Sequence, residues 1–437
     1  MKRYDSYKDS GIEWIGEVPN HWEVRRIKSL SIVKRGASPR PIDDPKYFDE
    51  NGTYAWVRIA DVTDSERYLT KTTQSLSFLG SSFSVKREPG DFFISIAGSV
   101  GKPIITQIKC CIHDGFVWFP NLHLNAEYLY YIFKSGQPYL GLGKLGTQLN
   151  LNTETIGNIC IPLPPEREIS DIINYLDKRC GEIDKAIAKQ QKRIELLQEL
   201  RQSIITNAVT RGINPDAPLK DSGVEWIGQV PSHWEVCRLK NHSHIVLGKM
   251  LMSSPPKGKE HLYTLEKYLK AKNIGWLHIT DDEDCIEEMW FNKYEKSIYR
   301  LQENDLVMNE GGDVGKIGIW RNHIYSCYIQ NSINKITIDN TCNPFYFQYL
   351  LFAIAKTNYF WSIVNPISIA HLTKEKLACT PIVCPPLSEQ QAIAAYLDKR
   401  CGEIDRAIAK QQKRIELLQE LKQSIITEVV TGKRKVC

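Results

Sequence analysis

The sequence predicts a mixed α/β protein with an internal repeat, in which two α/β bodies are separated by two long helices that form a coiled coil. Two repeated segments in each half predict this architecture. Residues 175–210 match residues 396–431 with four differences in 36 positions, and residues 8–28 match residues 220–240 with five differences in 21. Each half therefore has a Trp- and Pro-containing opening segment, a variable body and a long charged segment.

The composition is that of a folded globular protein. The chain has 437 residues and is long enough for two or three domains with separate cores. Its net charge of +5 permits a polyanionic partner. The opening residues lead into no apolar signal region, and no uninterrupted apolar run reaches the length of a membrane helix. We expect a cytoplasmic protein with no membrane partner.

Twelve cysteines are scattered along the chain without a C-x-x-C motif. No paired Cys/His spacing places ligands around zinc, and no H-E-x-x-H motif is present. The sequence therefore predicts reduced thiols and no metal site.

Each long segment carries isoleucine and leucine at alternating intervals of four and three residues, interrupted by polar positions. This spacing is typical of the line along which two helices pair, and we call its members the seam residues. They are Ile183, Ile187, Ile194, Leu197 and Ile204 in the first segment and Ile404, Ile408, Ile415, Leu418 and Ile425 in the second. A helix from Glu166 to Ala208 would be roughly 65 Å long.

Start and stop signals flank both long segments. A Pro-Pro pair precedes each, and Ser388 with Gln391 matches a capping box at the start of the second. Gly212 and Gly432 stand where a left-handed C-cap is favoured. Gly181 and Gly402 lie inside the helical pattern, where glycine is unfavourable, which suggests close packing at these two positions.

The bodies between the repeats combine strand-like and helical segments. In the first body, residues 54–62, 91–98 and 111–119 are rich in aromatic and β-branched residues and predict strands, followed by a helix with Asn125 as N-cap. In the second body, residues 274–282, 304–312 and 328–338 predict strands. Asn343-Pro344 then begins a helix that ends near Lys356.

Two glycine-rich segments resemble a phosphate-binding loop without completing its pattern. Residues 98–103 read GSVGKP and residues 311–317 read GGDVGKI, but the first required glycine is Ile96 in one and Glu310 in the other. Neither Lys102 nor Lys316 is followed by Ser or Thr. We interpret both as turns between strands.

The order of these motifs resembles that of the DNA sequence-specificity subunits of type I restriction-modification systems. The similar segments are DSGIEWIGEVPNHWEV and DSGVEWIGQVPSHWEV at the start of each half and the W-V-R-I-A-D and W-L-H-I-T-D segments in the bodies. The segments IPLPPEREI and VCPPLSEQQAI precede the long helices, and RQSIITNAVTRG and KQSIITEVVTGK end them. The resemblance covers nearly the whole chain, although the family's Pro-Pro-x-x-Glu-Gln pattern becomes Pro164-Pro165-Glu166-Arg167-Glu168-Ile169 in the first half, with Ile169 in place of Gln.

The resemblance implies two target recognition domains that read the two halves of a split, asymmetric DNA site. It implies domain 1 over residues 1–165, a long helix over 166–211, domain 2 over 212–386 and a second long helix over 387–437. The two helices are implied to pair antiparallel, to hold the domains apart and to dock two modification subunits, which restriction subunits then join. S-adenosylmethionine, ATP and Mg²⁺ are expected on those partners, and no cofactor and no catalysis are expected in this chain.

The repeat supports this division of labour independently of the resemblance. Near-identical helices present one surface twice and suit two copies of one partner, whereas different bodies suit two different half-sites. A coiled-coil scaffold without DNA specificity and a self-contained DNA methyltransferase or nuclease are the alternatives.

Candidate base-reading residues are loop positions with the side chains that recognise bases or phosphates. They are Lys34, Arg35, Ser38, Arg40, Arg58, Gln148 and Asn150 in the first body and Lys249, Lys257, Lys259, His278, Asn309, Gln330 and Asn331 in the second. Trp56 and Trp276 are expected to belong to the core instead of stacking on bases.

Overall fold

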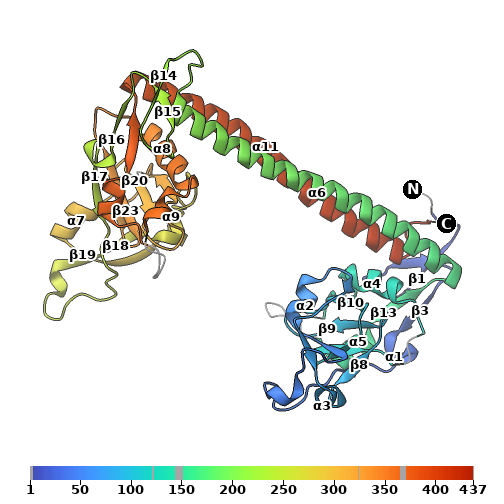
Figure 1. Ribbon diagram of the computed structural model, residues 1–437. Coiled ribbons are helices and arrows are strands. Elements are labelled where there is room, and N and C mark those ends of the chain that lie inside the picture. Colours follow the sequence, from blue (N-terminus) through green and yellow to red (C-terminus); the bar gives the residue numbers. More distant parts are fainter. Residues whose placement is uncertain (1–2, 121–122, 143–150, 323, 365–370, 437) are drawn as a thin grey trace. The chain divides into compact units, whose positions relative to one another are not determined.

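The computed structural model describes residues 3–120, 123–142, 151–322, 324–364 and 371–436. The chain divides into two compact units (Figure 1): unit 1 comprises residues 1–191 and 413–437, and unit 2 comprises residues 192–412. The long helices α6 (Glu166–Arg211) and α11 (Leu387–Val430) each contribute one part to each unit. Each unit thus contains one α/β domain and one segment from each long helix.

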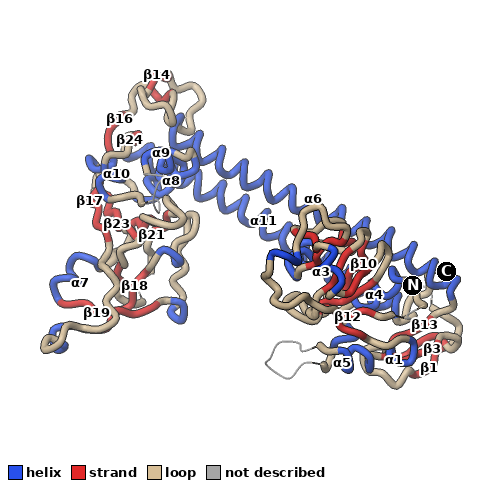
Figure 2. The backbone as a smooth tube through the Cα atoms, turned by 60° about the horizontal axis from the view of Figure 1, so that its bottom comes forward, coloured by secondary structure: helices blue, strands red, loops and turns tan. Residues whose placement is uncertain are grey.

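Unit 1 contains two sheets and two short strand pairs (Figure 2). The first sheet has the order β4 (Lys34–Arg35), β12 (Phe116–Trp118), β9 (Phe92–Ser95), β10 (Pro103–Thr106), β6 (Tyr68–Leu69). The second has the order β7 (Gln74–Leu76), β5 (Tyr54–Val57), β11 (Cys110–Ile112), β8 (Val85–Arg87). The pairs are β1 (Tyr7–Asp9) with β2 (Glu17–Pro19) and β3 (Glu23–Arg26) with β13 (Cys160–Leu163). Only β10/β6 and β11/β5 are parallel among the described strand pairs of unit 1.

Short helices complete unit 1. They are α1 (Ile27–Leu30), α2 (Ile59–Asp64), α3 (Phe78–Ser82), α4 (Ala126–Lys134) and α5 (Thr153–Asn158), with 3-10 turns η1 (Pro45–Tyr47) and η2 (Gln137–Tyr139). The side chain of Asn125 accepts hydrogen bonds from the backbone N–H groups of Glu127 and Tyr128, as the sequence predicts for an N-cap.

Unit 2 repeats part of this sheet order. Its four-stranded sheet has the order β17 (Ser243–Leu247), β23 (Ile333–Ile338), β20 (Leu306–Asn309), β21 (Ile317–Ile319), and its three-stranded sheet has the order β19 (Glu287–Asn292), β18 (Tyr263–Leu269), β22 (Tyr328–Ile329). The strand pairs are β14 (Leu219–Asp221) with β15 (Gln229–Pro231) and β16 (Glu235–Arg238) with β24 (Pro381–Cys384). Strands β18 and β22 are parallel, like β5 and β11 in unit 1.

The helices of unit 2 include α7 (Lys293–Tyr299), α8 (Pro344–Lys356), α9 (Tyr359–Ile363) and α10 (Lys374–Ala378). The 3-10 turns are η3 (Leu239–Asn241), η4 (Glu260–Leu262), η5 (Ala271–Asn273) and η6 (Glu283–Cys285). Helix α8 begins at Pro344 with Asn343 as its N-cap and ends at Lys356, which confirms the predicted helix.

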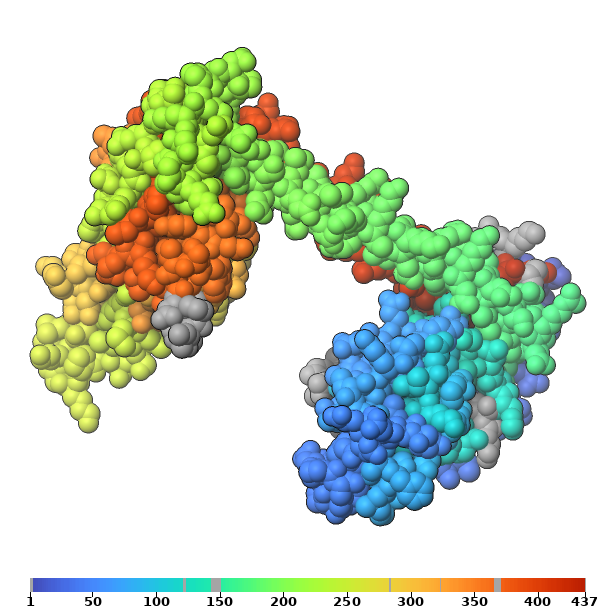
Figure 3. All heavy atoms as spheres, viewed as in Figure 1, coloured from blue at the N-terminus to red at the C-terminus, as the bar shows by residue number. Residues whose placement is uncertain are grey.

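The long helices pack antiparallel within each unit (Figure 1), and their atoms lie against each other in the space-filling view (Figure 3). In unit 1, Lys422 Nζ on α11 lies 2.7 Å from Asp184 Oδ1 on α6. In unit 2, Arg201 Nη1 on α6 lies 3.2 Å from Asp405 Oδ1 on α11. The mixed α/β fold with two long antiparallel helices, predicted from the repeats, is therefore confirmed.

A buried tyrosine in each α/β domain contacts the end of a long helix. Tyr128 Oη lies 3.4 Å from the carbonyl oxygen of Val430 in unit 1, and Tyr346 Oη lies 3.2 Å from that of Val209 in unit 2. Each hydroxyl also lies close to a strand carbonyl, Tyr128 Oη 3.0 Å from that of Pro162 and Tyr346 Oη 3.2 Å from that of Val383. Burial raises the pKa of both tyrosines well above the ordinary value, so each hydroxyl keeps its proton and stays a donor between strand and helix end.

A buried tryptophan fixes the start of each long helix. The indole N–H of Trp22 donates to Glu168 in the first turn of α6 at 3.1 Å, and that of Trp234 donates to Glu389 in the first turn of α11 at 3.0 Å. The histidine before each tryptophan lies 2.6 Å from the same carboxylate. Burial would raise the pKa of Glu168, but hydrogen bonds from neighbouring side chains outweigh it and hold this pKa below its ordinary value.

Several sequence predictions in the bodies need correction. Residues 54–62 form strand β5 only as far as Val57 and then turn into helix α2, because Asp61 accepts a hydrogen bond from the Arg58 backbone N–H in a capping arrangement. The predicted strand over residues 274–282 is wrong, since this segment makes only the isolated bridge between Ile274 and Ile279. Residues 111–119 and 328–338 each form two strands separated by a turn.

The two glycine-rich segments connect neighbouring antiparallel strands, as predicted. One joins β9 to β10 and the other joins β20 to β21. The predicted C-caps are also confirmed, because Gly212 and Gly432 have φ values of +76° and +73°. The predicted capping box at Ser388 is wrong, because α11 begins one residue earlier, at Leu387. Among the described helices, none combines the length and apolarity that a membrane span requires.

The predicted close packing at the two interior helix glycines is wrong. A Cβ atom built on Gly181 or Gly402 meets no other atom within 4 Å. By contrast, a Cβ atom on Gly80 in α3 would lie 2.2 Å from the carbonyl oxygen of Tyr47. The helix glycines therefore cost helix propensity without a packing reason in this chain.

We expect Gly181→Ala and Gly402→Ala to raise the free energy of unfolding, each by up to about 1 kcal/mol, because alanine favours the helix and its methyl group enters open space. Urea denaturation followed by circular dichroism measures the change. Gly80→Ala is the matched contrast and should destabilise the chain. A loss of stability in both helix variants would contradict the assigned geometry.

Candidate nucleic-acid interface

Three candidate residues of the first body converge on one turn. The Arg35 side chain donates to the backbone carbonyl of Asp114 at 3.0 Å, and Ser38 and Arg40 donate to its carboxylate at 3.0 and 3.1 Å. Partial burial would raise the pKa of Asp114, but the hydrogen bond from Ser38 and the charge of Arg40 hold it below its ordinary value. Lys34 lies on the same strand, β4, and is exposed. The turn thus gathers exposed cationic side chains around one carboxylate.

Arg58 lines a separate cavity of about 560 Å³ beside this turn. Its guanidinium donates to the side-chain oxygen of Gln74, and His113, the neighbour of Asp114, lines the same cavity. Burial lowers the pKa of His113 more than the adjacent carboxylate raises it, so this imidazole is neutral at pH 7. Arginine and glutamine are the side chains that pair with guanine and adenine edges. His113 Nδ1 accepts the backbone N–H of Gly115 at 2.8 Å, so the neutral imidazole offers only its Nε2–H group, a donor.

Trp56 and Trp276 both pack with core residues, as the sequence predicts. Trp56 is buried beneath the cavity and packs against Leu76 and Cys111. Trp276 is half-buried, with the Lys356 Nζ atom 3.3 Å from its ring centroid. Gln148 and Asn150 lie outside the described residues.

Two candidates of the second body are buried and, as placed, do not reach a surface. Lys249 is 7% exposed, and its ammonium lies 2.5 Å from Glu295 and donates to the carbonyl of Trp290. Asn309 is 1% exposed and donates to the carbonyl of Ala271 at 3.2 Å. Their assignment as surface loop residues is therefore corrected: the donor group of each is bound inside unit 2, while Asn309 Oδ1 is buried without a hydrogen-bond partner in the described part of the chain.

The other candidates of the second body are accessible but dispersed. Lys257 and Lys259 are exposed in the loop before η4. Gln330 and Asn331 hydrogen-bond to each other at 2.6 Å in the turn between β22 and β23. His278 is exposed and lines a pocket beside the long helices.

All ten seam residues are buried or half-buried. Ile183, Ile194, Ile404, Ile415 and Ile425 are at most 6% exposed, and the other five are half-buried. The seam therefore faces inward within each unit, where it holds the helices together. Gln190, a polar interruption of the seam spacing, is buried as well.

Exposed leucines form a different face of the same helices. Leu196 and Leu200 on α6 are 51% and 47% exposed, and the equivalent Leu417 and Leu421 on α11 are 52% and 45% exposed. Large apolar side chains that remain this exposed mark surfaces for protein contacts when they cluster. These leucines lie outside the 4-3 spacing of the seam, so the periodic pattern of the sequence does not single them out.

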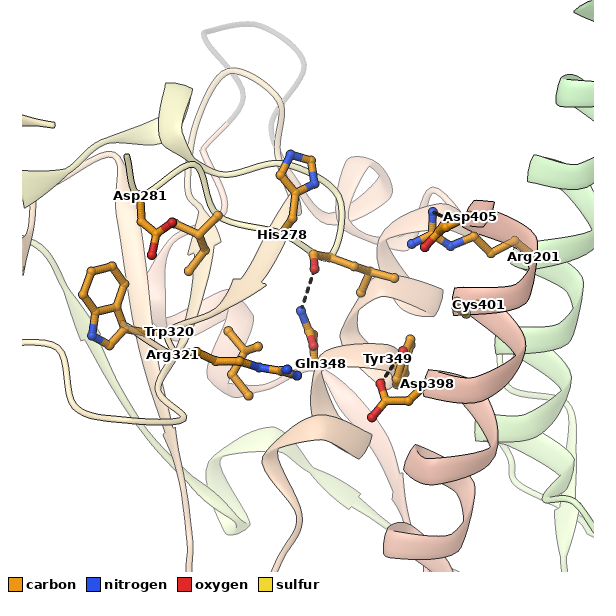
Figure 4. Close-up of a pocket in the computed structure, with 14 residues that line it drawn as sticks. Arg201, His278, Asp281, Trp320, Arg321, Gln348, Tyr349, Asp398, Cys401 and Asp405 are labelled. Carbon is orange, nitrogen blue, oxygen red and sulfur yellow. Dashed lines mark hydrogen bonds and ion pairs between the residues drawn. The ribbon is translucent and has the colours of Figure 1, made fainter. Parts of the chain in front are cut away.

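Each unit has an equivalent pocket where its α/β domain meets the long helices. In unit 2, Tyr349 and Asp398 point toward one another across a pocket of about 420 Å³, with Arg201 beside Asp405 (Figure 4). In unit 1 the pocket measures about 530 Å³ and contains Tyr131. The two helix glycines line these pockets.

A tyrosine–aspartate hydrogen bond joins helix and domain in both pockets. Tyr131 donates to Asp177 at 2.5 Å, and Tyr349 donates to Asp398 at 2.8 Å. Burial and the carboxylate acceptor raise the pKa of both tyrosines, so they remain donors. The two hydrogen bonds hold the helices against the domains. Arg67 and Arg201, which also line these pockets, each have a buried Nε atom without a hydrogen-bond partner among the described residues.

Comparison with known proteins places this architecture in one family. The family model described as type I restriction modification DNA specificity domain matches residues 19–195 and 231–419. Two specificity subunits of Methanocaldococcus jannaschii are similar over nearly their full lengths. The putative type I restriction enzyme MjaX subunit is 27% identical over 97% of this chain and 96% of its own, and the MjaVIII subunit is 24% identical over 96% and 94%.

A solved structure has the same fold. That structure belongs to work on the structural basis of complex assembly and conformational transition of the type I R-M system. Its matching chain has a TM-score of 0.69 at 17% identity, with 94% of this chain and 98% of that chain covered. The match of the family model over both halves shows that this chain belongs to the family of type I restriction modification DNA specificity domain proteins.

Proposed function

We propose that this chain is the DNA sequence-specificity subunit of a type I restriction-modification complex, in which each α/β domain reads one half of a bipartite, asymmetric DNA site. The observation that carries this proposal is the contrast between the repeated long helices and the differing α/β domains in a chain of this family. Residues 175–210 and 396–431 of the long helices are nearly identical, whereas the polar surfaces of the two domains differ. Identical surfaces suit two copies of one partner, and different surfaces suit two different half-sites.

The chain contributes the address in this proposal and the partners contribute the chemistry. Two modification subunits would bind S-adenosylmethionine and methylate adenine, and restriction subunits would use ATP and Mg²⁺ to translocate and cut DNA. No cofactor is assigned to this chain, and the complex would act in the cytoplasm. The matched relatives are named as specificity subunits of type I restriction enzymes, which supports this division.

The most direct test of modularity exchanges one domain surface. Replacing residues 29–161 with the equivalent segment of another family member should change one half of the methylated motif and leave the other half unchanged. Sequencing methylated adenines in cells that carry the chimera and its partners measures both halves. The same chain without partners should neither methylate nor cut DNA. A change in both half-sites, or methyl transfer by the isolated chain, would contradict the proposal.

Arg58 is the first residue to test for base recognition. We expect Arg58→Ala to weaken binding of the specific site about 10- to 100-fold and to relax the preference at one base pair, because a bidentate contact contributes about 1–3 kcal/mol of discrimination. Competition binding with DNA variants, measured on the complex with modification subunits, gives both quantities. Arg25→Ala is the matched control, because Arg25 does not line the Arg58 cavity. Unchanged affinity and preference would remove Arg58 from the interface.

The exposed leucines offer a test of partner docking. We expect Leu196→Ser with Leu200→Ser to weaken the binding of one modification subunit, and Leu417→Ser with Leu421→Ser to weaken the binding of the other. Each double variant should therefore yield complexes with a single modification subunit by light scattering after size exclusion. Gln198→Ser with Gln202→Ser, exposed polar positions on the same part of α6, is the control. Full occupancy in both leucine variants would show that these leucines do not dock the partner.

A further inference from the structure

Three metal-ligating side chains meet in unit 2 although they are far apart in sequence. The Nδ1 atom of His242 lies 3.5 Å from Cys342 Sγ, and Cys342 Sγ lies 3.9 Å from Cys384 Sγ. All three ligand atoms lie within 4.8 Å of one another. Cys342 is buried, and the other two residues are half-buried.

These distances fit the edges of a tetrahedral zinc site. With Zn–S near 2.3 Å and Zn–N near 2.0–2.1 Å, tetrahedral angles place two sulfurs about 3.8 Å apart and a sulfur and a nitrogen about 3.6 Å apart. The two measured edges agree with these values to within a few tenths of an ångström. Two thiolates and one imidazole are also a ligand set that zinc prefers.

The side-chain amide of Gln390 lies close to both sulfur atoms. Its side-chain N–H group lies 3.4 Å from Cys384 Sγ and 3.8 Å from Cys342 Sγ, while its oxygen accepts the backbone N–H of Asn343. Gln390 is only 1% exposed. Hydrogen bonds of this kind orient ligands and stabilise thiolates around a bound metal.

Unit 1 shows what the same location looks like without ligands. Cys384 faces Glu235 across the β16/β24 pair, and Leu163 faces Glu23 across the β3/β13 pair, so Leu163 is the equivalent of Cys384. Cys342 and Leu124 each immediately precede the N-cap asparagine of an equivalent helix.

The sequence repeats identify the unit 1 equivalents of His242 and Gln390. His242 corresponds to Leu30 after the equivalent strand, and Gln390 corresponds to Ile169 in the equivalent helix turn. All four residues of unit 1 belong to its hydrophobic core or pack against it. Where unit 1 has three leucines and an isoleucine, unit 2 has His, two Cys and Gln. Cys342 and Cys384 still pack in the apolar core, but this set can also bind a metal.

We propose that His242, Cys342 and Cys384 bind a zinc ion as three protein ligands, with a water molecule in the open fourth position. Binding forms two Zn–S bonds and one Zn–N bond, and each thiol releases one proton. The positive charge of the ion would stabilise the two thiolates.

Such an ion would tie together three segments of unit 2. His242 follows η3, Cys342 lies just before α8, and Cys384 ends β24 immediately before the Pro-Pro pair that leads into α11. Zinc would therefore fix the junction between the second α/β domain and its long helix, where unit 1 relies on leucine packing.

The test compares zinc content in the full-length, untagged chain purified under reducing conditions with zinc supplied. The wild-type chain should hold about one zinc ion per molecule by mass spectrometry of its metals, and cobalt substitution should produce a thiolate-to-cobalt absorption band. The triple variant His242→Leu, Cys342→Leu, Cys384→Leu restores the residues of unit 1, so it should fold but bind no zinc. Cys379→Ser, an exposed cysteine of the same unit, is the matched control and should retain the ion.

A thermal readout separates binding at this site from adventitious zinc. A strong chelator should lower the melting temperature of the wild-type chain and of Cys379→Ser, but not that of the folded triple leucine variant. Equal zinc content in the wild-type and triple-leucine chains would overturn the proposal. Zinc-free wild-type protein with reduced thiols, or a Cys342–Cys384 disulfide in protein kept reduced, would do so as well.

Discussion

The last turns of a long helix are buried in the core of each unit, and the rest of the fold depends on this packing. In unit 1, Ile425, Ile426 and Val429 of α11 belong to the same core as the first α/β domain. In unit 2, Ile205 and Val209 of α6 do the same for the second domain. Neither domain core is complete without a helix segment, so burial of apolar surface couples domain folding to helix pairing.

This constraint explains why the helices repeat so closely while the domains differ. Many residues of the repeated segment pack in the seam, in a domain core or on the exposed leucine face. Each of these surfaces occurs twice, so the same residues are required twice. The sheet order β4-β12-β9-β10 recurs as β17-β23-β20-β21, so the framework of the domains is also shared. The polar side chains on that framework differ, as specificity for two half-sites requires.

The sequence predicts the features that depend on local periodicity and capping. The seam spacing predicts the paired helices, and Asn125, Asn343 and the two C-cap glycines mark helix ends correctly. Strand β18 was missed, because its polar residues hide the pattern of a half-buried strand. The segment around Trp276 has strand-like composition, but its neighbours in unit 2 leave it only one isolated bridge.

Site residues depend on tertiary contacts that no local pattern contains. Lys249 resembles a surface cation in the sequence, yet Glu295, 46 positions away, binds it inside unit 2. Gln74 and His113 line one cavity with Arg58 because β7, β5 and β11, which carry or precede these residues, are neighbours in one sheet. The proposed zinc ligands form no sequence motif for the same reason: 100 positions separate His242 from Cys342, and 42 separate Cys342 from Cys384.

The central claim is that this chain supplies the DNA address of a modification complex. The measurement that tests it most directly is the map of methylated adenines in a host that carries this chain with its modification and restriction partners, compared with the same host lacking only this chain. The account predicts one bipartite motif, two short specified sequences separated by an unspecified spacer, that disappears when the chain is removed. A motif that persists without the chain, or a single continuous motif, would contradict it.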